Sequence, residues 1–113
     1  MARLHVVPLS GTLSVARQIS PADWQAIAAA GFKSLVCNRP DGESPGQCHS
    51  QDMAAAAHQA GLTTAYLPVV SGRVSPQDGR AFGELLNQLP APVRAYCRSG
   101  MRSATLWALS QAG

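Results

Sequence analysis

Short, largely apolar segments at residues 32–37, 63–67 and 93–96 predict three buried strands along the chain. The first has Leu35 and Val36 at its centre, the second is stopped by Pro68, and the third leads directly into Cys97. Two further segments, 4–7 and 13–16, precede them and predict a hairpin or a pair of edge strands.

Four helices are predicted from their start and stop signals. Ser20 is followed by a proline and then by Asp23, which is the order of an N-cap, a first helical residue and a first-turn acid. Gly31 ends that helix. Ser50 is expected to cap a second helix, and Ser75 begins a third with the same start signature as Ser20. The predicted helices cover residues 21–30, 51–60, 76–89 and 102–112.

Strands and helices therefore alternate through most of the chain. This order predicts an α/β fold with a mainly parallel central sheet flanked by helices. We find no linker, internal repeat or low-complexity segment, so residues 1–113 are expected to form a single domain.

Composition narrows the functional classes. Of 113 residues, 46% are hydrophobic and 13% charged, which is typical of a compact globular protein. The net charge of +3 is small and scattered, so a nucleic-acid partner is not expected. The longest apolar runs have five residues, whereas a membrane helix needs about twenty. The N-terminus lacks the apolar core of a signal peptide, so we expect a cytoplasmic protein with no membrane contact.

Three cysteines, an odd number without a Cys-x-x-Cys pair, exclude a disulfide framework and a cysteine-rich zinc site. The histidines have no metal-ligand spacing, and we expect neither a metal nor an organic cofactor. Cys37 is expected in the core. Cys48, in a polar loop, is a weak candidate for a resolving thiol, which leaves Cys97 as the candidate working thiol.

Cys97 follows a buried strand and precedes a helix, the position at which parallel α/β sheets bind ligands. Free N–H groups at the helix start, together with Arg102, are expected to lower the pKa of its thiol. Gly100 allows a tight anion-holding turn, and Arg102 offers a bidentate fork to an oxyanion. We therefore predict Cys97 and Arg102 as catalytic. The predicted anion-binding loop comprises Arg98, Ser99, Gly100, Met101 and Ser103.

Two other loops carry candidate supporting residues. Asp41 and Glu43 follow a strand end. Either they only form a turn, or one of them acts as a substitute general acid or as a partner that orients Arg102. Arg39 either contacts the bound anion or pairs with Asp41. Ser71 is expected at the rim of the pocket. We assign Arg39, Asp41 and Ser71 to the surroundings of the site.

Two resemblances accompany these residues. The loop from Cys97 to Ser103 resembles the active-site loop of single-domain rhodaneses, sulfurtransferases whose cysteine carries a persulfide. Nearly the whole chain resembles the phosphatase-like domain of bacterial beta-lactamase hydrolase-like proteins, which is related in fold to dual-specificity tyrosine phosphatases. The matching segments are 14–15, 18–19, 31–36, 38–43, 60–62, 68–69 and 106–109. This second resemblance implies a protein-tyrosine-phosphatase-like fold.

Two departures from tyrosine phosphatases bear on the chemistry. Four residues, not five, separate Cys97 from Arg102, and segment 68–73 lacks the acid that those enzymes place before the cysteine. Both departures favour a rhodanese-type sulfurtransferase that passes sulfane sulfur through a Cys97 persulfide. Its partners would be a small anionic donor, thiosulfate or a persulfide, a thiol acceptor, and a persulfide-oxidising enzyme. The alternatives are a phosphatase that uses a Cys97 phosphocysteine and a non-enzymatic anion-binding or adaptor module.

Overall fold

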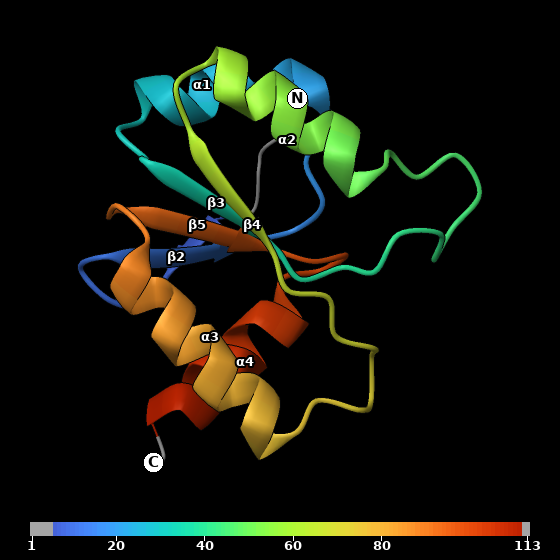
Figure 1. The fold of residues 1–113 in the computed structure, drawn as a ribbon, viewed down its shortest axis with the longest axis vertical. Helices are drawn as coiled ribbons and strands as arrows, with labels where there is room; N and C mark the ends of the chain where they lie inside the picture. The colour runs from blue at the N-terminus through green and yellow to red at the C-terminus, as the bar shows by residue number, and fades with distance from the viewer. Residues whose placement is uncertain (1–5, 112–113) are drawn as a thin grey trace.

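Five strands form one mostly parallel sheet in the computed structural model, which describes residues 6–111 (Figure 1). The strands are β1 (Val6–Pro8), β2 (Leu13–Ala16), β3 (Ser34–Cys37), β4 (Thr63–Tyr66) and β5 (Val93–Tyr96), in the order β1-β2-β5-β3-β4. Only the β1–β2 pair is antiparallel, which confirms the predicted hairpin. Residues 4 and 5 of its first predicted segment lie outside the described residues.

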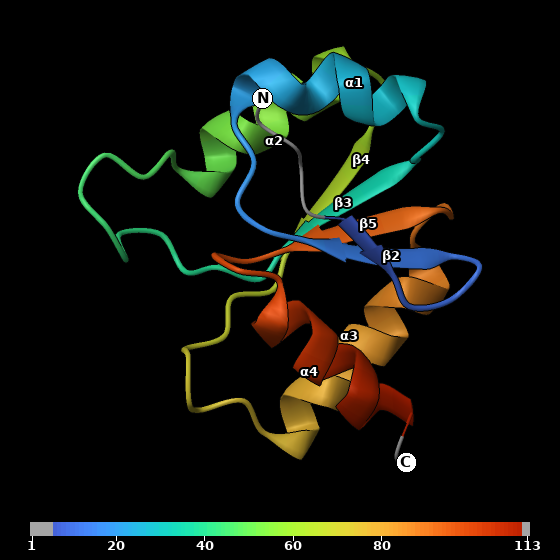
Figure 2. The ribbon, with the colours of Figure 1, turned by 180° about the vertical axis from the view of Figure 1, so that it is seen from behind.

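Helices cover both faces of the sheet. They are α1 (Trp24–Ala29), α2 (Ser50–Gln59), α3 (Pro76–Gln88) and α4 (Met101–Gln111), with a 3₁₀ turn, η1 (Pro21–Asp23), before α1. Figures 1 and 2 show α1 and α2 on one face and α3 and α4 on the other. The predicted α/β fold with a flanked, mainly parallel sheet is confirmed. No helix within residues 6–111 has the length and apolar character needed to cross a bilayer.

Each face of the sheet buries its own apolar core. The core under α1 and α2 includes Trp24, Ile27 and Met53, and the core under α3 and α4 includes Phe82 and Leu106. Strands β3 and β5 are buried along their whole length, because they lie inside the sheet and contribute to both cores. Even their polar residues, Ser34 and Arg94, are therefore buried.

Two of the three predicted serine caps are present at the helix starts. Ser20 and Ser75 are the N-caps that their signatures predict, and each forms a capping box with the first-turn acid, Asp23 and Asp78 respectively. Ser50 is not the cap of α2 but its first residue, and the carboxylate of Asp41 accepts hydrogen bonds from the Ser50 N–H (2.8 Å) and hydroxyl (3.0 Å). A side chain from the preceding loop thus replaces the local cap.

The four parallel strands all end at one edge of the sheet, and a connecting segment leaves it after each of them. Figure 1 shows segments 38–49 and 67–75 leaving this edge beside the turn that joins β5 to α4. Asn38 continues the ladder, because its N–H donates to the Tyr96 carbonyl (2.8 Å) and its own carbonyl accepts from Val69 (3.0 Å). The fold therefore brings three distant segments of the chain to Cys97.

Candidate active site

Cys97 begins the tight turn between β5 and α4, and we call residues 97–103 the Cys97 loop. The loop is anchored to the end of β2, because Cys97 N–H donates to the Ala16 carbonyl and Gln18 N–H donates to the Arg98 carbonyl, both at 3.3 Å. Gly100 has a φ of +95°, and a Cβ there would lie 3.4 Å from the Ala16 carbonyl. The positive φ favours glycine at this position, as the tight turn predicts, whereas the Cβ would make only an ordinary contact.

Backbone N–H groups of the Cys97 loop converge on the Sγ atom of Cys97. The Gly100 N–H donates to Sγ at 3.0 Å, and the amides of Ser99, Arg102 and Ser103 also act on it. Burial raises the pKa of this thiol, but these four donors outweigh burial, and its pKa is lowered overall. Met101 N–H does not join them, since it donates to the Ser99 hydroxyl (3.3 Å), and its side chain is exposed.

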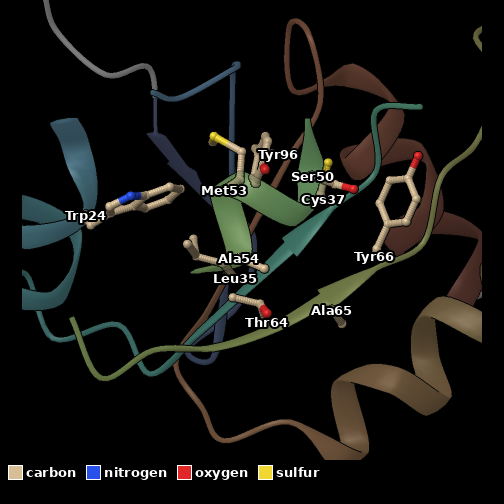
Figure 3. A pocket seen from close by; sticks show the side chains of 10 residues that line it. All are labelled: Trp24, Leu35, Cys37, Ser50, Met53, Ala54, Thr64, Ala65, Tyr66 and Tyr96. Carbon is tan, nitrogen blue, oxygen red and sulfur yellow. The ribbon is translucent and has the colours of Figure 1, made fainter. Parts of the chain in front are cut away.

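Cys37 provides an internal comparison for this effect. It is also buried, but burial dominates its environment and raises the pKa of its thiol. Its side chain lines a separate cavity of about 260 Å³ beneath α1 and α2, beside Met53 and Tyr96 (Figure 3). The predicted core role of Cys37 is confirmed. Cys48 packs against the core on that same face, and burial raises its pKa too.

The guanidinium of Arg102 reaches back over the loop from the first turn of α4. Its Nη1 donates to Glu43 Oε2 at 2.6 Å and to the Val69 carbonyl at 3.0 Å, while Nη2 donates to Glu43 Oε1 at 2.9 Å. A hydrogen bond to Glu43 and the charge of the Cys97 thiolate both raise the pKa of Arg102, so it stays cationic beside the sulfur. The predicted pairing of Cys97 with Arg102 is therefore present in space.

Glu43 is the residue of segment 38–49 that supports the site. Its carboxylate bridges two guanidinium groups, because Arg39 Nε donates to Oε1 at 3.0 Å while Arg102 occupies both oxygens. Arg39 is 6% exposed and is itself fixed by Gln18 Oε1 (3.1 Å) and Ser44 Oγ (2.9 Å). Hydrogen bonds from Arg102, and then from Arg39, lower the pKa of Glu43 despite its partial burial. The carboxylate is therefore ionised at neutral pH.

Asp41, by contrast, does not contact the Cys97 loop. Its carboxylate holds Ser50, and its N–H donates to the Tyr66 hydroxyl at 3.0 Å. Glu43, not Asp41, pairs with Arg39 and contacts Arg102. The predictions that Asp41 supports the site and that it pairs with Arg39 are therefore wrong. Asp41 has a structural role at the start of α2.

Asn38 is a site residue that the sequence analysis did not single out. Its side chain is fully buried, accepts from the Ser103 hydroxyl at 2.8 Å and donates to the Leu67 carbonyl at 2.9 Å. The Ser103 hydroxyl therefore points to Asn38, and Ser103 acts on the Cys97 sulfur only through its backbone N–H. The available signal was an amide side chain placed directly after a buried strand.

A surface hollow of about 460 Å³ adjoins the Cys97 loop on the side of segment 67–75, and we call it the Ser71 hollow. Its polar lining comes from Ser71, Arg98, Ser99, Arg102 and Thr105. The rim position predicted for Ser71 agrees with this placement. Cys97 itself is 0% exposed and does not line the hollow, which its neighbours Arg98 and Ser99 border. No cluster of metal-binding side chains occurs within residues 6–111.

Comparisons with known proteins agree with this geometry. A family model described as "Beta-lactamase hydrolase-like protein, phosphatase-like domain" matches residues 6–113. A beta-lactamase hydrolase-like protein of Agrobacterium fabrum is 36% identical over 109 residues, which is 96% of this chain and 25% of that protein. The chain thus spans about a quarter of the length of this curated relative.

Solved structures show the same fold. A candidate phosphatase of Neisseria meningitidis superposes with a TM-score of 0.88 at 34% identity, over 94% of this chain and 75% of that chain. TpbA of P. aeruginosa, solved in complex with pTyr, superposes with a TM-score of 0.69 at 18% identity, over 91% of this chain and 59% of that chain. The second likeness shows the fold alone, which is that of protein-tyrosine-phosphatase-like proteins.

Proposed function

Because the chain belongs to the family of the phosphatase-like domain of beta-lactamase hydrolase-like proteins, we propose that it is a cysteine-dependent phosphatase. Cys97 is the nucleophile, and Arg102 with the amides of the Cys97 loop binds the phosphoryl oxygens. The observation that supports this most strongly is the hydrogen bond from the Gly100 N–H to a buried sulfur at 3.0 Å, in a loop whose amides lower the pKa of that thiol despite its burial. Such an arrangement stabilises a thiolate, which is the reactive form.

The reaction has two balanced steps. In the first, the Cys97 thiolate attacks phosphorus, an S–P bond forms, and the P–O bond breaks with its electron pair leaving on the oxygen. In the second, water attacks phosphorus, the S–P bond breaks, the thiolate is restored and inorganic phosphate departs with the protons of the water. The amides and Arg102 offset the charge on the phosphoryl oxygens in both steps.

The comparison with Cys37 supports this role over a purely structural one. A cysteine that only fills the core has its pKa raised by burial, as Cys37 does. Cys97 is also buried, at 0% exposed against 8% for Cys37, but its pKa is lowered. Since Cys97 is 0% exposed, the atoms that cover it must shift before a substrate reaches its sulfur.

Sulfur transfer is the second candidate. It is favoured by the spacing of four residues between Cys97 and Arg102, and by the enclosure of the sulfur, since Cys97 is 0% exposed. In that reaction the thiolate attacks the outer sulfur of thiosulfate, the S–S bond breaks and sulfite leaves. A thiol acceptor then takes the sulfur from the Cys97 persulfide, and a persulfide-oxidising enzyme would be a fitting partner.

Parallel assays separate these candidates. We expect wild-type protein to release phosphate from nitrophenyl phosphate, Cys97→Ser to release none, and Cys48→Ser, the matched control, to retain activity. Thiosulfate with cyanide is assayed on the same samples. Thiocyanate formation without phosphate release would replace the phosphatase by the sulfurtransferase, and activity in neither assay would indicate an anion-binding module.

A further inference from the structure

Proton donors near the bound phosphate decide which phosphates a cysteine-dependent enzyme can cleave. An alkoxide or phenoxide leaves slowly unless an acid within about 2.6–3.2 Å protonates it. All six acidic residues of the chain lie within residues 6–111. Apart from Glu43, they form capping boxes (Asp23, Asp78), hold Ser50 (Asp41) or are exposed on helices α2 and α3 (Asp52, Glu84).

Glu43 is therefore the carboxylate that reaches the site, and its surroundings prevent it from acting as an acid. Both of its oxygens accept hydrogen bonds from Arg102, and one accepts a third from Arg39. Protonating this carboxylate would break the bidentate pair and leave two guanidinium groups without their shared counter-ion. Glu43 thus positions Arg102 and has no proton to donate.

The Ser71 hollow shows what the leaving group meets instead. Segment 67–75 is held over the Cys97 loop, because the Val69 carbonyl accepts from Arg102 and the Val69 N–H donates to Asn38. The ionisable side chains that line the hollow are Arg98 and Arg102, both cations, and hydroxyl groups make up the rest of its polar side chains. Such a lining stabilises a departing anion without protonating it.

Building on the proposed phosphatase function, we propose that the substrates are phosphoric anhydrides or acyl phosphates, whose leaving groups depart as stable anions. The Cys97 thiolate attacks the terminal phosphorus, and the P–O bond to the second phosphate or the carboxylate breaks. That group takes the bonding electron pair and leaves as an unprotonated anion toward Arg98. Alkyl phosphates and phenolic phosphates such as phosphotyrosine are poor substrates, because their leaving groups need a proton.

The test measures kcat/KM for nitrophenyl phosphate, phenyl phosphate, acetyl phosphate and pyrophosphate. We expect acetyl phosphate and pyrophosphate to be cleaved well. Phenyl phosphate should fall about 10²-fold or more below nitrophenyl phosphate, the range of a missing general acid. Ser71→Asp places a carboxyl group in the Ser71 hollow and should raise phenyl phosphate turnover at least several-fold, whereas its matched control Ser71→Asn should not.

Arg98 is tested with a matched exposed cation. Arg98→Ala should lower pyrophosphate cleavage more than nitrophenyl phosphate cleavage, while Arg73→Ala, which does not line the hollow, should change neither. Equal wild-type activity on phenyl and nitrophenyl phosphate would overturn this substrate class and leave the phosphatase function standing. No hydrolysis of any of the four compounds would overturn both.

Discussion

Replacing Glu43 by glutamine tests how the site holds Arg102. The substitution keeps the size of the side chain but removes its charge and one acceptor oxygen. The new amide N–H₂ group would face the N–H groups of Arg102 or Arg39, which already donate to Glu43 at 2.6 to 3.0 Å. Arg102 therefore loses its bidentate partner and becomes free to leave the Cys97 loop.

The magnitude follows from the exposure of the two side chains. A hydrogen bond to a charged group contributes about 1.5–3 kcal/mol. The Glu43 side chain is 24% exposed and that of Arg102 is 10% exposed, so solvent screening favours the low end of this range. About 1.5 kcal/mol corresponds to a decrease in kcat/KM of about tenfold.

The assay is nitrophenyl phosphate hydrolysis by wild type, Glu43→Gln and the matched control Glu84→Gln, whose side chain is exposed on α3. The loss should appear as weaker substrate binding and a changed pH profile, with the thermal melt recorded to show that the fold persists. An unchanged or increased kcat/KM for Glu43→Gln would refute the reasoning. Glu43 would then compete with the substrate for Arg102 and not position it.

Three further predictions follow from the same contacts. Ser103→Ala should destabilise the protein by about 1–3 kcal/mol, because it leaves the buried Asn38 carbonyl oxygen unpaired; urea unfolding measures this, and a loss under 0.5 kcal/mol contradicts it. Asp41→Ala should lower the free energy of unfolding by about 1 kcal/mol, because the Ser50 N–H at the start of α2 loses its acceptor. The kcat should stay within twofold of wild type, and a large loss of kcat would show that Asp41 belongs to the site. The lowered pKa of Cys97 predicts that iodoacetamide labels it at a lower pH than a free thiol of pKa about 8.5. Because the pKa of Cys97 is lower in the folded protein than in the unfolded protein, its thiolate stabilises the fold at pH values above the unfolded-state pKa. That contribution is lost as the pH falls through the folded pKa, and labelling at the ordinary thiol pH would contradict both statements.

Local sequence signals predicted much of this molecule because local chemistry determines those features. The capping boxes at Ser20 and Ser75 need only residues three positions apart. The turn at Gly100 and the donors around Cys97 likewise arise within seven consecutive residues. Such features carry their signal in the chain itself.

Features that depend on tertiary contacts were less predictable. Asp41 and Glu43 are two residues apart in the same polar loop, and only the path of segment 38–49 places one on Ser50 and the other on Arg102. The role of Asn38 depends on Ser103, 65 positions away.

The expectation of sulfur transfer depended partly on the length of the Cys97 loop. The count of four residues between Cys97 and Arg102 is correct, but such a count does not determine which group binds. The family and its phosphatase-like structural relatives favour phosphoryl transfer. The spacing remains the main argument for the alternative chemistry.

The most direct test of the account is to trap the covalent intermediate. Wild-type protein is mixed with acetyl phosphate, quenched in acid within the first turnover, and analysed by intact mass and by peptide mapping. We predict one added phosphoryl group, located on Cys97, absent from Cys97→Ser and present in Cys37→Ser. An added sulfur atom on Cys97 after thiosulfate treatment, with no phosphoryl adduct from acetyl phosphate or nitrophenyl phosphate, would contradict it.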